Sequence, residues 1–173
     1  KCFLKFGRHT VLDHVLERAK NYNLTPIICT TKNKEDDSIE QLADSNNCKI
    51  FRGPTQNKLL RWFLCCQHFN LQYFHSVDAD DPFFCGEEVK RSLDLLQNEN
   101  YDIISPTKSS ENGGATVGYS IRTKVLEDIV KVLNYDQDTE MISMYLNELN
   151  GVKKIRLEEP KNFILTERLT LDY

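Results

Sequence analysis

Three carboxylates stand within four residues in the segment 77–82, which reads Val-Asp-Ala-Asp-Asp-Pro. The segment follows the apolar and aromatic run 71–77, which predicts a buried strand that the proline ends. Carboxylates at the carboxyl end of a central strand lie where open α/β sheets bind their ligands. Because the three negative charges repel one another, we expect a cation among them, and a hard divalent ion with phosphate oxygens is the usual partner.

A second group of polar residues follows two other predicted strands. Thr30 and Thr31 end the strand 25–31, where their hydroxyl groups could reach a base or a ribose, or could simply form a turn. Arg52 and Gly53 close the next strand. The arginine suits a phosphate or a carboxylate bound through two hydrogen bonds, and the glycine allows a tight turn.

Polar residues on two predicted helices have both a binding and a structural interpretation. Arg61 could meet a phosphate or the carboxylate of a substrate, but arginines on helices are as often surface ion-pair partners. Asn57 and Lys58 have the same two interpretations. Glu140 could bind a sugar, or it could complement the dipole of the helix that starts beside it.

The spacing of apolar residues predicts the elements that position these side chains. Helices are expected at 10–21 with Thr10 as N-cap, from about 36 with Ser38 and Gln41 at capping-box spacing, and at 57–69, 87–96, 124–133 and 139–149. Strands are expected at 25–31, 48–51, 71–77, 101–105, 115–121, 152–158 and 163–171, with a loop at 106–114. Strands and helices alternate over the first 105 residues, and the chain opens on a helix with no strand before it. This order predicts βαβ units in one α/β domain with a mainly parallel sheet.

The composition disfavours two classes of partner. The chain has 173 residues, of which 40% are hydrophobic, so it can bury the core of one globular domain. Its net charge of −4, without a basic patch, argues against nucleic-acid binding. No stretch is apolar enough to span a bilayer and no signal peptide is visible, so we expect no membrane partner and a cytoplasmic location.

The cysteines and histidines show no metal-binding pattern. Six cysteines lack CxxC spacing and histidine partners at zinc spacing, which favours reduced thiols that pack as small core residues. His75 stands in the middle of a predicted strand, and we expect a satisfied core residue there rather than a catalytic base.

Taken in order along the chain, these motifs resemble a known family. Residues 1–20 (KCFLKFGRHTVLDHVLERAK) resemble the segment that follows the Arg-rich, Gly-containing nucleotide loop of cytidylyltransferases that activate acidic sugars, in particular the spore-coat polysaccharide SpsF-type branch. The likeness continues through Thr30-Thr31, Asp36-Asp37-Ser38-Ile39, Phe51-Arg52-Gly53, Leu59-Leu60-Arg61, the acidic segment, the strand at 114–120 and the closing Arg168-Leu169-Thr170-Leu171-Asp172-Tyr173. The resemblance implies a three-layer, Rossmann-like fold of the nucleotide-diphosphosugar-transferase type, with a mixed, mainly parallel sheet.

The resemblance also implies a reaction, in which CTP is joined to a sugar hydroxyl and pyrophosphate is released. Asp80 and Asp172 would hold Mg²⁺, and Lys1 would close the nucleotide loop and neutralise the triphosphate. Asp78 and Asp81 would support the metal ligands, and the nucleotide would meet the residues already noted at the ends of the strands. The implied partners are CTP, an acidic keto-sugar for surface polysaccharide or glycan synthesis, and a second copy of the chain in a homodimer.

Two departures from the family keep other functions open. The nucleotide loop that should precede Lys1 and the helix that should follow Asp172 are not in the sequence, so we expect the working protein to be longer at both ends. Asp78-Ala79-Asp80 is also a DxD motif, which in glycosyltransferases holds a metal against a nucleotide-sugar diphosphate. A third possibility is a non-catalytic nucleotide-binding domain. The sequence does not name the sugar.

Overall fold

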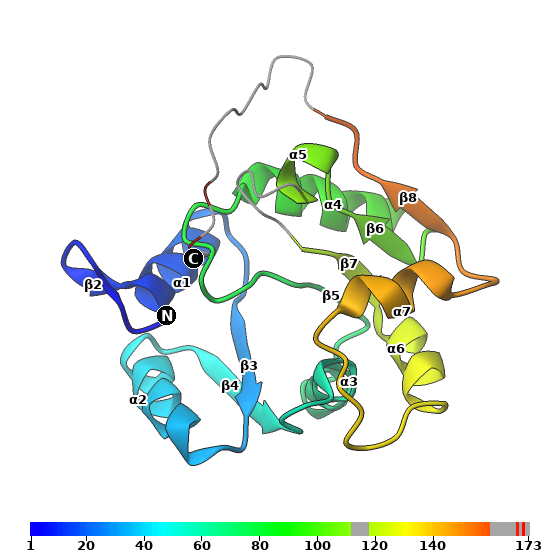
Figure 1. Cartoon of the computed structure of the whole chain (residues 1–173). Helices are drawn as coiled ribbons and strands as arrows, with labels where there is room; N and C mark the ends of the chain where they lie inside the picture. The colour runs from blue at the N-terminus through cyan, green and yellow to red at the C-terminus, as the bar shows by residue number, and fades with distance from the viewer. Residues whose placement is uncertain (112–117, 160–168, 170, 172–173) are drawn as a thin grey trace. The chain divides into compact units, whose positions relative to one another are not determined.

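The structure is a computed structural model that describes residues 1–111, 118–159, 169 and 171 (Figure 1). Strands and helices alternate from α1 to α6, which includes most of the first 105 residues where the sequence predicts alternation. The chain forms two compact units, which we describe separately. The first unit contains Lys1–Thr25, His75–Ser120 and Lys153–Tyr173, and the second contains Pro26–Phe74 and Ile121–Val152.

The first unit opens with a short antiparallel hairpin and a helix. Strands β1 (Lys5–Phe6) and β2 (His9–Thr10) pair with each other, and α1 (Val11–Asn21) follows directly. The expectation that no strand precedes this helix is therefore wrong. Thr10 is confirmed as the N-cap: its hydroxyl accepts from the backbone N–H of Asp13, and its own N–H donates to the Asp13 carboxylate.

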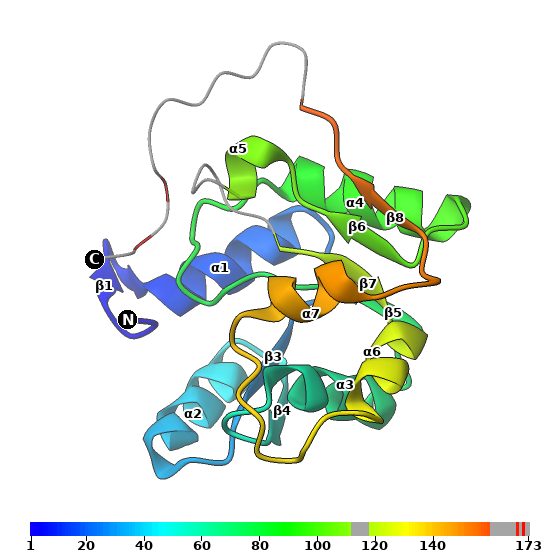
Figure 2. The same cartoon turned by 45° about the vertical axis from the view of Figure 1, so that its right-hand side comes forward.

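The rest of the first unit builds helices and strands around an apolar core. Its remaining elements are α4 (Gly86–Asn98), β6 (Ile103–Ser105), α5 (Lys108–Glu111) and β8 (Lys154–Arg156). Strands β6 and β8 are parallel, and α4 runs alongside them in both views (Figure 1, Figure 2). The largest fully buried side chains of the first unit include Phe84, Val89, Leu96, Ile103 and Ile104.

Two strands carry the chain from one unit to the other. They are β5 (Tyr73–His75) and β7 (Ser120–Arg122), and the four-stranded sheet has the order β5-β7-β6-β8. The buried strand predicted at 71–77 is shorter than expected, with only Tyr73–His75 in strand pairing. Residues 115–117 and nearly all of the strand predicted at 163–171 lie outside the described residues.

The second unit contains a parallel strand pair and four helices. Strands β3 (Ile27–Thr31) and β4 (Lys49–Gly53) pair so that Thr31 lies opposite Gly53. The helices are α2 (Asp37–Ser45, after the 3₁₀ turn η1, Lys34–Asp36), α3 (Lys58–His68), α6 (Thr123–Val130) and α7 (Ile142–Glu148). The buried faces of α3 and α6 supply Leu59, Trp62, Cys65, Cys66, Val125, Leu126 and Ile129 to its core.

Two local predictions are wrong for an identifiable reason. Ser38 does not cap α2, because that helix begins at Asp37, one residue earlier. Residues 106–114 are not all loop, because α5 forms within them. The buried carboxylate of Glu88 accepts hydrogen bonds from the Thr107 N–H and the Ser110 hydroxyl, and so stabilises the start of this short helix.

All six cysteines are free thiols, and two of them lie in the core of the second unit. Cys65 and Cys66 are buried. The contact with Cys29, together with burial, raises the pKa of Cys65, and burial raises the pKa of Cys66 to about 11. Both thiols are therefore neutral at physiological pH, which suits side chains that pack among apolar neighbours. As for the helices, each one within the described ranges falls short of the length and apolar character that a membrane span requires.

Candidate functional site

The acidic segment folds as successive turns directly after β5. The N–H of Asp81 donates to the carbonyl of Asp78 at 3.1 Å, and the N–H of Phe84 donates to the carbonyl of Asp81 at 3.3 Å. These turns give the three carboxylates different environments. Asp78 is exposed, Asp80 is part-exposed, and Asp81 is buried.

Lys1 and Asp80, both expected at the catalytic centre, lie together. The ammonium Nζ of Lys1 is 3.6 Å from the Asp80 carboxylate, and their side chains remain 27% and 30% exposed. A carboxylate that is partly open to solvent and already faces a cation has the donor chemistry for a hard divalent ion. Asp172, the other expected metal ligand, lies outside the described residues.

The backbone before the acidic segment is fixed by Ser76. Its N–H donates to the carbonyl of Tyr119 at 2.9 Å, and its carbonyl accepts from the N–H of Gly118 at 3.0 Å. Its hydroxyl accepts from the N–H of Tyr119 at 3.0 Å. These three hydrogen bonds join the backbone directly before the acidic segment to residues 118–119.

Within the described ranges, no group of three or more His, Cys, Asp or Glu side chains is arranged to hold a metal ion.

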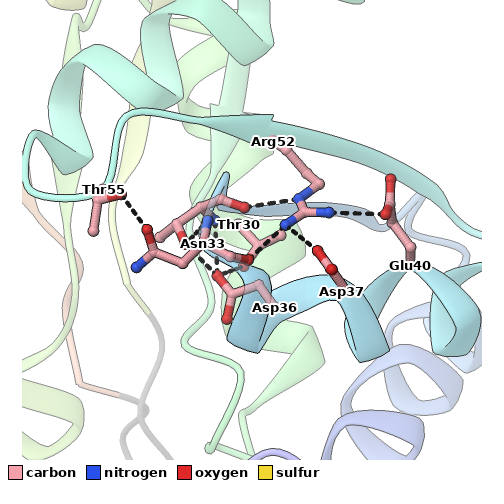
Figure 3. A network of polar contacts seen from close by, with 8 residues as sticks. Thr30, Asn33, Asp36, Asp37, Glu40, Arg52 and Thr55 are labelled. Atoms are coloured by element: carbon pink, nitrogen blue, oxygen red, sulfur yellow. Dashed lines mark hydrogen bonds and ion pairs between the residues drawn. The ribbon is translucent and has the colours of Figure 1, made fainter.

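A second polar cluster lies in the second unit, at the carboxyl end of β3 (Figure 3). The Asp36 carboxylate accepts from the Thr30 hydroxyl at 2.8 Å, the Thr31 hydroxyl at 2.5 Å and the Thr31 N–H at 3.1 Å. Burial opposes ionisation of Asp36, but the hydrogen bonds from Thr31 and Thr30 outweigh it and hold its pKa below the usual value. Asp36 was not among the site residues predicted from the sequence.

Arg52, expected to contact the nucleotide, is bound by groups of its own unit. Its guanidinium donates to the carbonyls of Thr31 at 2.9 Å and Asn33 at 2.6 Å. It also forms ion pairs with Asp37 and Glu40, each at 2.8 Å (Figure 3). Arg52 therefore fixes the backbone at the end of β3 and joins it to α2.

An open depression of about 390 Å³ lies beside this cluster in the second unit. It is lined by Lys32, Gly53, Pro54, Thr55, Gln56, Tyr135 and Asp136. Arg61 is 8% exposed and supports one wall, because its Nη1 donates to the carbonyls of Pro54 at 2.6 Å and Thr55 at 3.0 Å. A Cβ at Gly53 would come within 2.9 Å of the Arg61 side chain, so the glycine permits this close packing.

Asn57 and Glu140, also expected to bind substrate, attach the segment 134–140 to the start of α3. The buried Asn57 carboxamide accepts from the Leu60 N–H and donates to the carbonyl of Asn134, each at 2.9 Å. Glu140 pairs with Lys58 at 3.1 Å. Asn57 and Arg61 thus lie behind the side chains that line the depression, whereas Tyr135 and Asp136, which the sequence analysis did not single out, line it directly.

His75 lies among buried polar groups in the first unit. Its Nδ1 is 2.8 Å from the hydroxyl of Ser120, which in turn accepts from the hydroxyl of Ser92 at 2.7 Å. Its Nε2 is shielded from solvent and has no hydrogen-bond partner among the described residues. Burial lowers the pKa of His75 to about 3, so the ring is neutral at physiological pH.

We expect the stability of the protein to fall as the pH drops below about 6.5, the usual histidine pKa. The unfolded chain then binds a proton at His75, whereas the folded protein binds it only near the lowered pKa of about 3. Between about pH 6.5 and 5 this difference amounts to about 2 kcal/mol. Urea unfolding of the wild type and of His75→Phe at both pH values measures it, with the exposed His9→Phe as the matched control. An unchanged pH dependence in His75→Phe would contradict the assignment.

The sequence of the chain is similar to those of several known proteins. No protein-family model matches the chain. An uncharacterized protein of Methanocaldococcus jannaschii is 27% identical over 176 residues, which cover 99% of this chain and 71% of the relative. The 3-deoxy-manno-octulosonate cytidylyltransferase of Rickettsia bellii is 29% identical over 129 residues, which cover 68% of this chain and 51% of the enzyme. The chain thus spans about half the length of that enzyme.

Solved structures show the fold. A cytidylyltransferase from Leptospira borgpetersenii matches with a TM-score of 0.83 at 22% identity, over 100% of this chain and 74% of its own. A CMP:2-keto-3-deoxy-manno-octonic acid synthetase in complex with CTP matches with a TM-score of 0.64 at 12% identity, and the match covers 91% of this chain and 83% of the synthetase chain. A Mycobacterium tuberculosis protein in complex with manganese matches with a TM-score of 0.62 at 13% identity, and the match covers 92% of this chain and 83% of that protein chain. The chain therefore has the mixed α/β fold of the nucleotide-diphosphosugar-transferase type that the family resemblance implied.

Proposed function

We propose that the chain is a nucleotidyltransferase that transfers CMP from CTP to a sugar hydroxyl and releases pyrophosphate. The observation that carries the proposal is the match of the whole chain to a solved cytidylyltransferase with a TM-score of 0.83. The cytidylyltransferase of R. bellii, similar in sequence over 68% of this chain, supports the same activity.

The described residues suit the two demands of this chemistry. Attack on the α-phosphate needs charge neutralisation and alignment of the reacting oxygens more than covalent help. Asp80 would hold the metal, with Asp172 as the other ligand, and Lys1 beside Asp80 would neutralise phosphate oxygens. A bound Mg²⁺ would supply Lewis-acid stabilisation of charge on the phosphate. Thr30, Thr31, Arg52 and Gly53 would border the nucleotide, with Asp78 near the metal.

The proposal also names the class of sugar, the residues on its side of the site, the use of the product and the oligomeric state. The sugar is an acidic keto-sugar, and Arg61, Asn57 and Glu140 act on its side of the site, directly or by supporting the residues that touch it. The product serves surface polysaccharide or glycan synthesis in the cytoplasm, as in the SpsF-type branch. The working protein is a homodimer. The name of the R. bellii relative, which acts on 3-deoxy-manno-octulosonate, supports the class of sugar.

Pyrophosphate release by the full-length protein tests the proposal. The protein is incubated with Mg²⁺, each of the four nucleoside triphosphates and a panel of 2-keto acid sugars. We expect release with CTP and at least one acidic keto-sugar. If no pair reacts but CTP raises the melting temperature, the sugar assignment is wrong. If CTP neither reacts nor binds, the nucleotidyltransferase proposal fails. Release of a nucleoside diphosphate from a nucleotide-sugar would instead identify a DxD glycosyltransferase.

A further inference from the structure

The hydroxyl groups of Thr30 and Thr31 both donate their protons to a carboxylate of the protein. Both contact the same carboxylate oxygen of Asp36, at 2.8 Å and 2.5 Å. An ionised carboxylate only accepts hydrogen bonds, so each hydroxyl must donate its single proton to it. The lowered pKa of Asp36 keeps the carboxylate ionised at neutral pH, which fixes this direction of donation.

The same two hydroxyls still have lone pairs to offer. A hydroxyl oxygen has two acceptor positions besides its proton. Thr31 Oγ1 uses one of them to accept from the Asn33 N–H at 3.1 Å, whereas no described residue donates to Thr30 Oγ1. Both threonines are part-exposed. Toward a ligand, the end of β3 therefore presents hydroxyl oxygens that accept and cannot donate.

The charges around the threonines disfavour a phosphate at this point. Asp36, Asp37 and Glu40 supply three carboxylates, and Arg52 is shared between the last two of them. The Arg52 guanidinium also donates to the carbonyls of Thr31 and Asn33, so its donors are directed to groups of the protein. Lys32 and Lys34 also stand in this stretch, but with Glu35 the carboxylates number four against three cations. A site of this charge that accepts hydrogen bonds suits an uncharged ligand edge that donates them.

We propose that Asp36 is a specificity-determining positioning residue, which holds the Thr30 and Thr31 hydroxyls as acceptors and so selects a nucleobase with a donating amino edge. The inference rests on the proposed function, in which the end of β3 borders the nucleotide, and it assigns the base to this point. Cytosine presents a 4-amino group with two N–H donors, whereas uracil presents a 4-oxo acceptor at the same position. Uracil would instead place the lone pairs of its 4-oxo group against the lone pairs of the two hydroxyls, without a hydrogen bond between them.

Binding of CTP and UTP to the full-length protein, measured by calorimetry in Mg²⁺, tests the inference. We expect the wild type to bind CTP at least about tenfold more tightly than UTP. In Asp36→Ala the hydroxyls can rotate and donate to a 4-oxo group, so the CTP/UTP preference should fall to about twofold or less. Asp36→Asn retains a carbonyl acceptor at the same position and should keep most of the preference.

Two further variants separate this role from a merely structural one. Asp37→Ala removes a neighbouring carboxylate that pairs with Arg52 and touches neither threonine, so it should keep the wild-type preference. Thr30→Val removes an acceptor and should weaken CTP binding about tenfold while leaving UTP binding unchanged. Equal losses for both nucleotides in Asp36→Ala, or an unchanged preference, would overturn the inference. Absence of CTP binding to the wild type would instead overturn the proposed function.

Discussion

Replacement of Asp80 by alanine is expected to lower the rate of CTP-dependent pyrophosphate release at least ~100-fold, which corresponds to about 2.7 kcal/mol of transition-state stabilisation. In the proposed function Asp80 holds a divalent ion against phosphate oxygens, and its carboxylate is partly open to solvent beside the Lys1 ammonium. Its loss would remove the contact that places positive charge at the reacting phosphate, and the other two carboxylates of the acidic segment lie in different environments. Asp78 is exposed, and Asp81 is buried.

The Asp80→Ala result can be separated from a loss of folding. A part-exposed ion pair such as Lys1–Asp80 contributes little to stability, so the melting temperature should stay close to that of the wild type. Asp94→Ala removes an exposed carboxylate from α4 in the same unit and should leave the rate unchanged. Asp80→Asn keeps the volume without the charge, and should lose nearly as much activity as the alanine variant. Full activity in Asp80→Ala would remove it from the catalytic site.

The positions of the main elements followed from local patterns in the sequence. The sequence predicted Thr10 as the N-cap of a helix, and α1 begins at the next residue. Thr30 and Thr31 do end a strand. These predictions succeed because the interactions that decide them join residues only a few positions apart, so the types and spacing of the residues are sufficient.

The partners of the polar side chains could not be predicted in the same way. Arg61 has the sequence context of a surface helix residue, but its guanidinium meets backbone carbonyls at 54 and 55, and carbonyls leave no mark in the sequence. The sequence predicted that the Thr30 and Thr31 hydroxyls could reach a base or a ribose, or could form a turn. Their hydrogen-bond partner is the Asp36 carboxylate, which a 3₁₀ turn brings back to the end of the strand.

Short elements were missed because their stabilising partner lies far along the chain. Helix α5 has a polar sequence without an apolar face, and the carboxylate that stabilises its start belongs to Glu88 on α4. The hairpin of β1 and β2 is too short for alternation to be visible, although Gly7 at its turn, with φ +66°, was an available signal. The division into two compact units likewise depends on contacts between distant segments, and the alternating pattern of strands and helices carries no sign of it.

Gly118→Ala is expected to destabilise the protein by about 3 kcal/mol, because the added methyl group has no space. A Cβ at this position would lie 2.2 Å from the Ser76 hydroxyl oxygen and 2.3 Å from the Ser76 carbonyl oxygen. The hydroxyl can rotate at the cost of its hydrogen bond from Tyr119, but the carbonyl belongs to the backbone and already accepts from the Gly118 N–H. The two segments must therefore separate, and that hydrogen bond must lengthen or break.

The displacement should also reach the acidic segment, because Ser76 stands two residues before Asp78. Urea unfolding of Gly118→Ala measures the loss of stability, and the rate of pyrophosphate release measures its effect on Asp80. Addition of Ser76→Gly removes the hydroxyl but not the carbonyl, so the double variant should recover less than half of the lost stability. Full recovery would show that the side chain alone is the obstacle. A stable single variant would mean that residues 76 and 118 do not pack as closely as the structure places them. The hydrogen bonds of Ser76 would then not fix the backbone before the acidic segment.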